Sequence, residues 1–213
     1  MKQLIVNADD FGYSYSINKG IIEAHTRGIV TSTSVMIDAI AAHEAKELTK
    51  FYDLSIGLHF EVIKIENIEA ELERQIDKFV SIVGKRPDHI DTHKRHTTEE
   101  VIKDVLEDYA KNHSTPVRCF DAKHIGSFGI NSNDGSVTQL KRSIDEATGE
   151  CSELMTHVGY SDDYLREHSS YNDPREDELK SICSTEIKQY IHDKGIVLIN
   201  WTEIHTINHI NSR

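Results

Sequence analysis

The stretch LIVNADDFG at residues 4–12 holds the pattern that decides the fold, because an apolar run ends directly in two adjacent aspartates. Its first three residues are typical of a short buried strand. A segment of helical period begins near Ser16, and its apolar residues share one face: Ile17, Ile21 and Ala24. Gly28 follows and predicts a left-handed helix stop. The chain therefore opens with a strand followed by a helix.

The same unit recurs along the chain. Further strands are predicted at residues 29–35, 54–60, 89–91, 117–120, 152–156 and 196–200. Helical stripes separate most of them, and the clearest consists of Ile68, Leu72, Ile76, Phe79 and Val83. Thr97 and Glu100 have the spacing of a capping box for another helix.

Strands that alternate with helices favour right-handed crossovers and a parallel sheet. We therefore expect an α/β chain with a parallel (β/α) barrel-like fold of about seven strands, in a single domain over residues 1–213. The active site is expected at the carboxyl ends of the strands. An open doubly wound sheet is the alternative.

The charge and hydropathy of the chain exclude some classes of binding partner. The 213 residues include 24 Lys and Arg against 36 Asp and Glu, and the net charge of -12 repels phosphate backbones and anionic lipids. No stretch approaches the roughly 20 consecutive apolar residues that cross a bilayer. We expect no nucleic acid and no membrane partner. The three cysteines form no close pair and no secretion signal is seen, so we expect reduced thiols and a cytoplasmic location.

Asp9 and Asp10 follow the first strand directly. Two desolvated carboxylates raise one another's pKa, and a nearby cation removes that cost. The alternative is that one aspartate caps the next turn while the other faces water. Position alone does not decide between them.

Histidines are abundant, with 13 in the chain, and three stand at the ends of predicted strands. His59 ends the third strand, His93 follows the fourth and His157 follows the sixth. Asp91 precedes His93 by two residues, where it can orient an imidazole. The alternatives are a neutral buried histidine and, for a residue such as His96, a solvated loop side chain.

Taken together, these side chains gather at the carboxyl ends of predicted parallel strands, the edge where α/β barrels assemble their active sites. One carboxylate and two imidazoles leave positions open for water on a divalent ion, whereas a closed set of four ligands is structural. The sequence therefore indicates a catalytic metal site.

These motifs resemble those of the YdjC-like carbohydrate deacetylases, the chitooligosaccharide deacetylase family. They occur in family order: VNADDFG at 6–12, GIVTSTS at 28–34, IGLH at 56–59, RPDHIDTH at 86–93, and MTH at 155–157 with Gly159 and Tyr160. Arg175, Glu178 and Leu179 fit the family's tail, so the resemblance covers nearly the whole chain. It implies a barrel-like fold and a metal-dependent hydrolase that removes N-acetyl groups from amino sugars such as N-acetylglucosamine oligosaccharides.

Carried over by position, the resemblance implies roles for five residues. Asp10, His59 and His93 would bind one divalent ion, Asp9 would be the general base, and His157 would assist the leaving amine. Histidine ligands suit zinc, while a carboxylate with open water positions also suits magnesium or manganese. The sequence does not identify the ion.

Substrate contacts are expected from Phe11, Asp91, His96, Arg118 and Arg175, with surface salt bridging as the alternative for the arginines. The chain departs from the family in three places. Lys94, Arg95 and Thr97 stand where members usually carry further histidines, Val158 replaces a common proline, and the segment between His59 and the helix at Ile68 is short.

Two other functions remain open at this point. The same site in another hydrolase would cleave a different small amide or ester, since a fold does not fix a substrate. A sugar-binding relative that has lost activity is the second, and the altered residues 94–97 make it conceivable. In each case we expect a small-molecule partner, with a homodimer as a candidate assembly.

Overall fold

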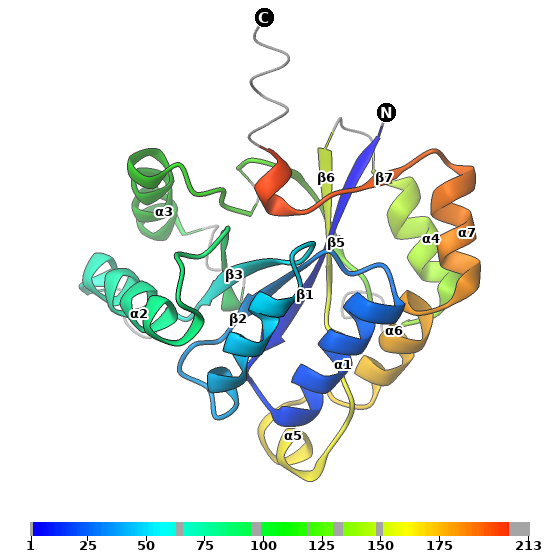
Figure 1. The fold of residues 1–213 in the computed structure, drawn as a ribbon, viewed down its shortest axis with the longest axis horizontal. Helices are drawn as coiled ribbons and strands as arrows, with labels where there is room; N and C mark the ends of the chain where they lie inside the picture. Colours follow the sequence, from blue (N-terminus) through cyan, green and yellow to red (C-terminus); the bar gives the residue numbers. More distant parts are fainter. Residues whose placement is uncertain are drawn as a thin grey trace, which may run out of the picture.

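A computed structural model describes residues 2–62, 66–94, 99–118, 120–129, 134–147 and 151–204 of the chain. They form one curled sheet of seven parallel strands with helices on its outer side (Figure 1). The strands are β1 (Gln3–Phe11), β2 (Ser32–Val35), β3 (Ser55–Phe60), β4 (Ile90–Thr92), β5 (Lys123–Ser127), β6 (Cys151–Thr156) and β7 (Val197–Leu198). The expected α/β barrel-like fold is confirmed.

The strand order is β4-β3-β2-β1-β6-β5, and β7 pairs with the beginning of β1. β1 is therefore central, and it shares one edge between β7 at Gln3 and Leu4 and β2 from Asn7 onward. Because every pair is parallel, all the carboxyl ends lie on the same side of the molecule.

Helices cover the convex side of the sheet. They are α1 (Tyr15–Arg27), α2 (Ile68–Val83), α3 (Glu100–His113), α4 (Val137–Asp145), α5 (Asp163–His168), α6 (Pro174–Ile182) and α7 (Thr185–Asp193), with 3-10 turns at Ala42–Lys50 and Trp201–Glu203. Ser14 caps α1 by accepting a hydrogen bond from the amide of Ile17. Short α5 lies beyond the carboxyl end of β1 (Figure 1).

The two faces of the sheet differ in chemistry. On β1, Leu4, Val6 and Ala8 belong to the main hydrophobic core beneath the helices. Asn7 instead donates to polar residues of β2 and β4, and Asp9 accepts from Arg118. Side chains alternate along a strand, so these two sets occupy opposite faces. The concave face is largely polar, and it is the face that carries the chemistry.

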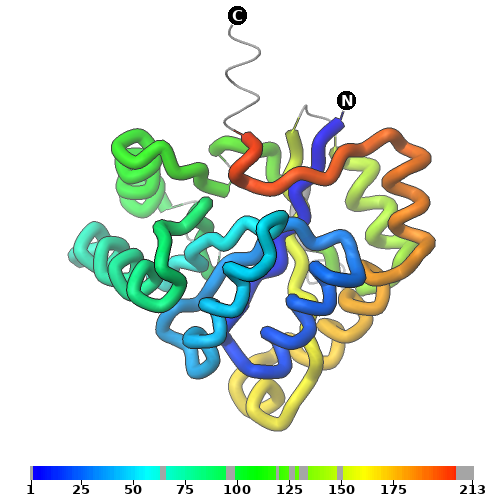
Figure 2. Tube along the Cα trace, viewed as in Figure 1, coloured from blue at the N-terminus to red at the C-terminus, as the bar shows by residue number. Residues whose placement is uncertain are grey.

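The amino-terminal end of the concave face is closed by a small second core. Ile5, Ala122, Ile199, Trp201 and Ile204 form it. The C-terminal segment crosses this end beside the start of β1 (Figure 2), and the amide of Ile199 bonds to the carbonyl of Leu4. The opposite, carboxyl-terminal end is therefore where a site can open.

Several expectations about single elements were wrong. The fifth strand is Lys123–Ser127 rather than residues 117–120, where Val117 makes only an isolated bridge to Ile90. Gly28 ends α1 without left-handed geometry, at φ -110. The helix α3 has Glu99 as its N-cap with no side-chain cap bond, and Thr97 of the expected capping box lies outside the described residues.

Within the described residues, no helix is long and apolar enough to span a membrane.

Candidate metal and catalytic site

Asp9 and Asp10 both face the same histidine, although neighbouring side chains on a strand normally point to opposite faces. The backbone of Asp10 has φ 73, a left-handed conformation that is rare outside glycine and is best tolerated by aspartate and asparagine. The pairing of β1 with β2 also shifts between Ala8 and Phe11. This break in the strand brings both carboxylates, almost fully buried, to the carboxyl edge of the sheet.

His59, near the end of β3, is held by its two ring nitrogens. Its Nδ1 lies 2.5 Å from Oδ1 of Asp91, and its Nε2 lies 3.4 Å from Oδ1 of Asp10 and 4.0 Å from Oδ2 of Asp9. Burial lowers the pKa of His59, but the charges of Asp91 and Asp9 outweigh it and raise the pKa well above its usual value. With Nδ1–H donated to Asp91, Nε2 faces the aspartate pair, and its proton would have to leave before this nitrogen could bind a metal ion.

His93 follows β4 and lies beside His59. The two ring centroids are 5.4 Å apart, and Nδ1 of His93 lies 3.8 Å from Oε1 of Glu61. Burial and the neighbouring charge of His59 lower the pKa of His93 to about 4. His93 is therefore neutral near pH 7, which is the form that binds a metal ion.

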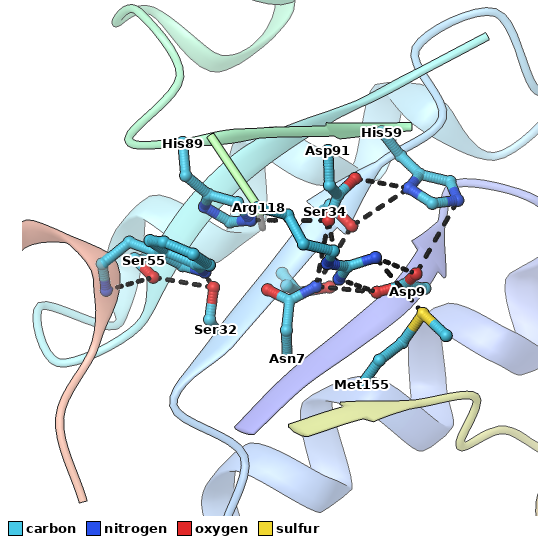
Figure 3. Close-up of polar contacts among 12 residues, drawn as sticks. Asn7, Asp9, Ser32, Ser34, Ser55, His59, His89, Asp91, Arg118 and Met155 are labelled. Carbon is cyan, nitrogen blue, oxygen red and sulfur yellow. Dashed lines mark hydrogen bonds and ion pairs between the residues drawn. The ribbon is translucent and has the colours of Figure 1, made fainter. Parts of the chain in front are cut away.

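Arg118 lies beneath the site in a cluster of carboxylates (Figure 3). Its Nη1 and Nη2 donate to Oδ2 and Oδ1 of Asp9 at 2.8 and 2.6 Å, Nη2 lies 2.8 Å from Oδ2 of Asp91, and Nε lies 3.0 Å from Oε1 of Glu153. The other oxygen of Glu153 lies 2.5 Å from Nδ1 of His124. A bidentate arginine fixes both the position and the plane of a carboxylate.

The guanidinium of Arg118 affects the charge of Asp9 as well as its position. Burial raises the pKa of Asp9, yet the charge and hydrogen bonds of Arg118, together with the charge of His59, bring the pKa below its usual value. The carboxylate of Asp9 is therefore ionised near neutral pH.

His157 and Arg175 complete the opposite side of the site. His157, directly after β6, is buried, and burial lowers its pKa although the charges of Asp10 and Asp9 oppose the shift. Nη2 of Arg175 donates to Oδ2 of Asp10 at 2.6 Å. Burial raises the pKa of Asp10, but Arg175 and the two histidines, His59 and His157, bring it well below its usual value.

The donor atoms in this site fit a divalent cation. Oδ1 of Asp10 is buried and has no hydrogen-bond partner among the described residues, while Nε2 of His59 is directed to it. An unpaired buried carboxylate oxygen is costly, and a cation offsets that cost. Asp10 and His59 offer one oxygen and one ring nitrogen 3.4 Å apart, and the ring of His93 lies beside that of His59. Oxygen and ring-nitrogen donors suit zinc and other divalent ions.

Among the described residues, one set of three ligand atoms is close enough to share an ion, and it differs from the set that the family resemblance implies. Asp9, His59 and Asp91 have ligand atoms within 4.8 Å of one another. However, Asp91 engages Nδ1 of His59, and both oxygens of Asp9 accept from Arg118. An ion in this place would have to displace a buried guanidinium, so we favour Asp10 over Asp91 as a ligand.

The five expected substrate contacts lie in different places. Phe11 is fully buried in the main core, and Asp91 and Arg118 lie beneath the site and bond to other site residues. Arg175 is also buried but bonds Asp10 directly. His96 lies outside the described residues.

Sequence reasoning missed the residues that support the site from below. Nδ2 of Asn7 lies within hydrogen-bond range of Asp9, Ser34 and Asp91, at 2.8, 3.2 and 3.4 Å. Glu153 holds Arg118 from β6. Strand alternation was the available signal, because Asn7 is two residues before Asp9, and Glu153 is paired in register with Ile5 on the same face.

Comparison with known proteins was made with both sequence and structure. A family model described as YdjC-like protein matches residues 3–65 and 60–193. The two matched parts overlap at residues 60–65. A "Carbohydrate deacetylase" of Clostridium beijerinckii is 32% identical over 250 aligned positions, covering 95% of this chain and all of the relative. A "Chitooligosaccharide deacetylase" of Proteus mirabilis is 30% identical, covering 94% of this chain and 98% of the relative.

Solved structures agree on the fold. A putative cellobiose-phosphate cleavage protein from Enterococcus faecalis superposes with a TM-score of 0.83 at 25% identity, covering 95% of this chain and 98% of that one. A family 4 carbohydrate esterase from Streptomyces lividans in complex with acetate has a TM-score of 0.61 at 12% identity, with coverage of 92% and 91%. At that identity the second likeness concerns the fold alone.

Proposed function

Since the chain belongs to the YdjC-like family, we propose that it is a metal-dependent deacetylase that hydrolyses N-acetyl groups of amino sugars, with N-acetylglucosamine oligosaccharides as the substrate class. The curated relatives named for carbohydrate or chitooligosaccharide deacetylation support the substrate class. The observation that carries the proposal is the approach of His59 to the unpaired oxygen of Asp10, with His93 beside them.

In this proposal, Asp10, His59 and His93 would hold one divalent ion. When bound, such an ion would lower the pKa of a water molecule toward about 7 and polarise a carbonyl group. Asp91 orients His59 through Nδ1, so that Nε2 is presented to the ion. The ion's identity, among zinc, magnesium and manganese, is part of what the experiment determines.

The protein's own residues move the protons. Asp9, ionised and clamped by Arg118, accepts a proton from the attacking water. His157 stands on the other side of the aspartate pair and would give a proton to the sugar nitrogen as the C–N bond breaks. Because burial lowers the pKa of His157, the imidazole must first take up a proton, and the water proton accepted by Asp9 is the source that the proposal supplies. The products are acetate and a free amine. Arg118 is a positioning residue here, because its guanidinium is fully engaged with carboxylates beneath the site.

The test is acetate release from short N-acetylglucosamine oligomers, measured before chelation, after chelation and after add-back of zinc, magnesium or manganese. We expect release to stop on chelation and to return with at least one ion. A metal-loaded protein that releases no acetate from any N-acetylated sugar would overturn the proposal. Acetate release from O-acetyl esters alone would reassign the chain as an esterase.

The variant Asp9→Asn distinguishes the role of a general base from that of a metal ligand. The amide keeps the shape of the side chain but cannot accept the proton, so turnover should fall by about 10²-fold or more, while the metal stays bound. Asp163→Asn, a change of a fully exposed aspartate, is the matched control. Acetate release by Asp9→Asn at the wild-type rate would refute the assignment of Asp9 as the base.

A further inference from the structure

Glu178 is fully buried on α6 and has no part in the reaction described above. Its carboxylate accepts three hydrogen bonds. Oε2 accepts from Oγ1 of Thr156 at 2.6 Å and from the backbone amide of His157 at 2.8 Å, and Oε1 accepts from the hydroxyl of Tyr171. One side chain therefore joins the end of β6 to the segment that leads into α6.

The carboxylate has little freedom to move. Gly129, after β5, packs directly on it, and a Cβ at this position would overlap the Glu178 side chain. Gly129 also has φ 87, a conformation that side chains rarely adopt. Four segments of the chain thus meet at Glu178, and the two oxygens are fixed relative to the strand end.

The imidazole of His157 lacks a polar support of its own. Its Nδ1 is buried with no hydrogen-bond partner among the described residues. Its ring is contacted edge-to-face by the ring of Tyr171, with centroids 5.8 Å apart at 72°. The orientation of this imidazole therefore depends on its backbone and on Tyr171, and both are bonded to Glu178.

The same tyrosine supports a second group of the site. The carbonyl of Tyr171 accepts a hydrogen bond from Nε of Arg175 at 2.9 Å, and the guanidinium lies 5.6 Å from the centre of its ring. Arg175 in turn donates to Asp10. A shift of Tyr171 would disturb both the histidine and the arginine that faces Asp10.

We propose that Glu178 is the positioning residue for His157: its carboxylate fixes the backbone of His157 and the ring of Tyr171, and so holds the imidazole where it can give a proton to the departing nitrogen. This role rests on the proposed function. It differs from the usual arrangement in which a carboxylate bonds the histidine ring itself, because here the carboxylate acts through a backbone amide and an aromatic contact.

Three variants test the role. Glu178→Gln keeps the shape but puts an NH2 group where one of the two oxygens accepts, so one set of hydrogen bonds has to rearrange; Tyr171→Phe removes only the hydroxyl, and Asp177→Asn is the control. Asp177 is exposed, lies on the same helix and pairs with Lys180 at the surface. For each, kcat and KM are measured by acetate release, metal affinity by calorimetry, and the His157 ring by NMR of ¹³C-labelled histidine, with its signal assigned from a His157→Gln sample.

We expect Glu178→Gln to lower kcat by about 10²-fold, the cost of misplacing a catalytic group by roughly an ångström. Tyr171→Phe should lower kcat by on the order of 10-fold, and the double variant should be little worse than Glu178→Gln, because both changes break one unit. KM and metal affinity should change little. The His157 ring signal should shift or broaden in both variants and stay unchanged in Asp177→Asn.

Wild-type kcat in a folded Glu178→Gln or Tyr171→Phe, or an unchanged His157 signal in either, would overturn the role. A rise in KM with unchanged kcat in these variants would also overturn the role. If Glu178→Gln does not fold, Tyr171→Phe carries the test alone. A wild-type protein without acetate release refutes the proposed function, while the His157 signal still reports whether Glu178 and Tyr171 hold the ring.

Discussion

Adjacent carboxylates at the end of β1 have different partners, and those partners separate their roles. Asp9 accepts hydrogen bonds from Arg118 with both oxygens, whereas Asp10 accepts one from Arg175 with Oδ2, and its Oδ1 has no hydrogen bond and lies 3.4 Å from Nε2 of His59. The adjacent aspartates in the sequence do not by themselves show whether the pair binds a cation or caps a turn. The difference arises from the left-handed backbone at Asp10 and from arginines distant in sequence, which no local pattern contains.

Metal affinity distinguishes Asp10 from Asp91. Asp10→Ala removes a ligand, so binding measured by calorimetry should be lost. Asp91→Asn keeps all three ligands and removes only the carboxylate behind His59, so affinity should fall by about 10–100-fold. Asp163→Asn again serves as the control. If Asp91→Asn loses the ion while Asp10→Ala retains it, the ion lies in the cluster of Asp9, His59 and Asp91.

The titration of Glu178 makes the free energy of unfolding depend on pH. Burial raises its pKa from 4.5 to about 7, although its three hydrogen-bond donors oppose the rise. Between these values the folded state holds more protons than the unfolded state, so stability is full below about 4.5 and falls as pH rises through 7. The 2.5-unit difference corresponds to about 3 kcal/mol.

Urea unfolding of wild type and Glu178→Gln, between pH 4.5 and 8, measures this contribution. The wild type should lose about 3 kcal/mol more than the variant across that range, because glutamine does not titrate and the other groups are common to both. If plots of the free energy of unfolding against pH run parallel for the two proteins, Glu178 has an ordinary pKa in the folded state.

At the scale of single elements, the sequence predicts strands best where both faces are apolar. The run at 117–120 is apolar except for Arg118, but its described residues form only an isolated bridge, whereas β5, with the sequence KHIGS, was missed. The reason is the polar concave face, since strands that line it carry serine, histidine and glutamate at alternate positions. Helices were easier to predict from the sequence, because their apolar stripes all face the same main core.

Gly57 in β3 is required by His89, the residue directly before β4. A Cβ at this position would overlap the ring of His89, which is fully buried and stacked on Trp201 with centroids 5.0 Å apart. Gly57→Ala should therefore lower the free energy of unfolding by about 1–3 kcal/mol, measured by urea denaturation.

Placing Gly57→Ala in a His89→Ala background isolates the cause. With the ring removed, the added methyl group should cost little or even fill space, so the two changes should couple strongly. Equal costs of Gly57→Ala in both backgrounds would mean that the clash with His89 is not the reason for glycine.

At the scale of the molecule, the βα rhythm was sufficient to predict the sheet type and about seven strands. The resemblance to a family, rather than spacing, supplied the ligand set and the base. What neither supplied is the support beneath the site, from Asn7, Arg118 and Glu153, and behind it, from Tyr171 and Glu178. These side chains act through contacts between segments far apart in sequence, which only the folded chain brings together.

The central claim is that Asp10, His59 and His93 converge on one cation. The most direct measurement is a crystal structure of the protein grown with zinc, with an anomalous difference map recorded at the zinc edge. We expect one strong peak at about 2.0–2.2 Å from Oδ1 of Asp10, Nε2 of His59 and a ring nitrogen of His93. A peak held by Asp9 and Asp91 instead, or none at this edge of the sheet, would contradict the claim.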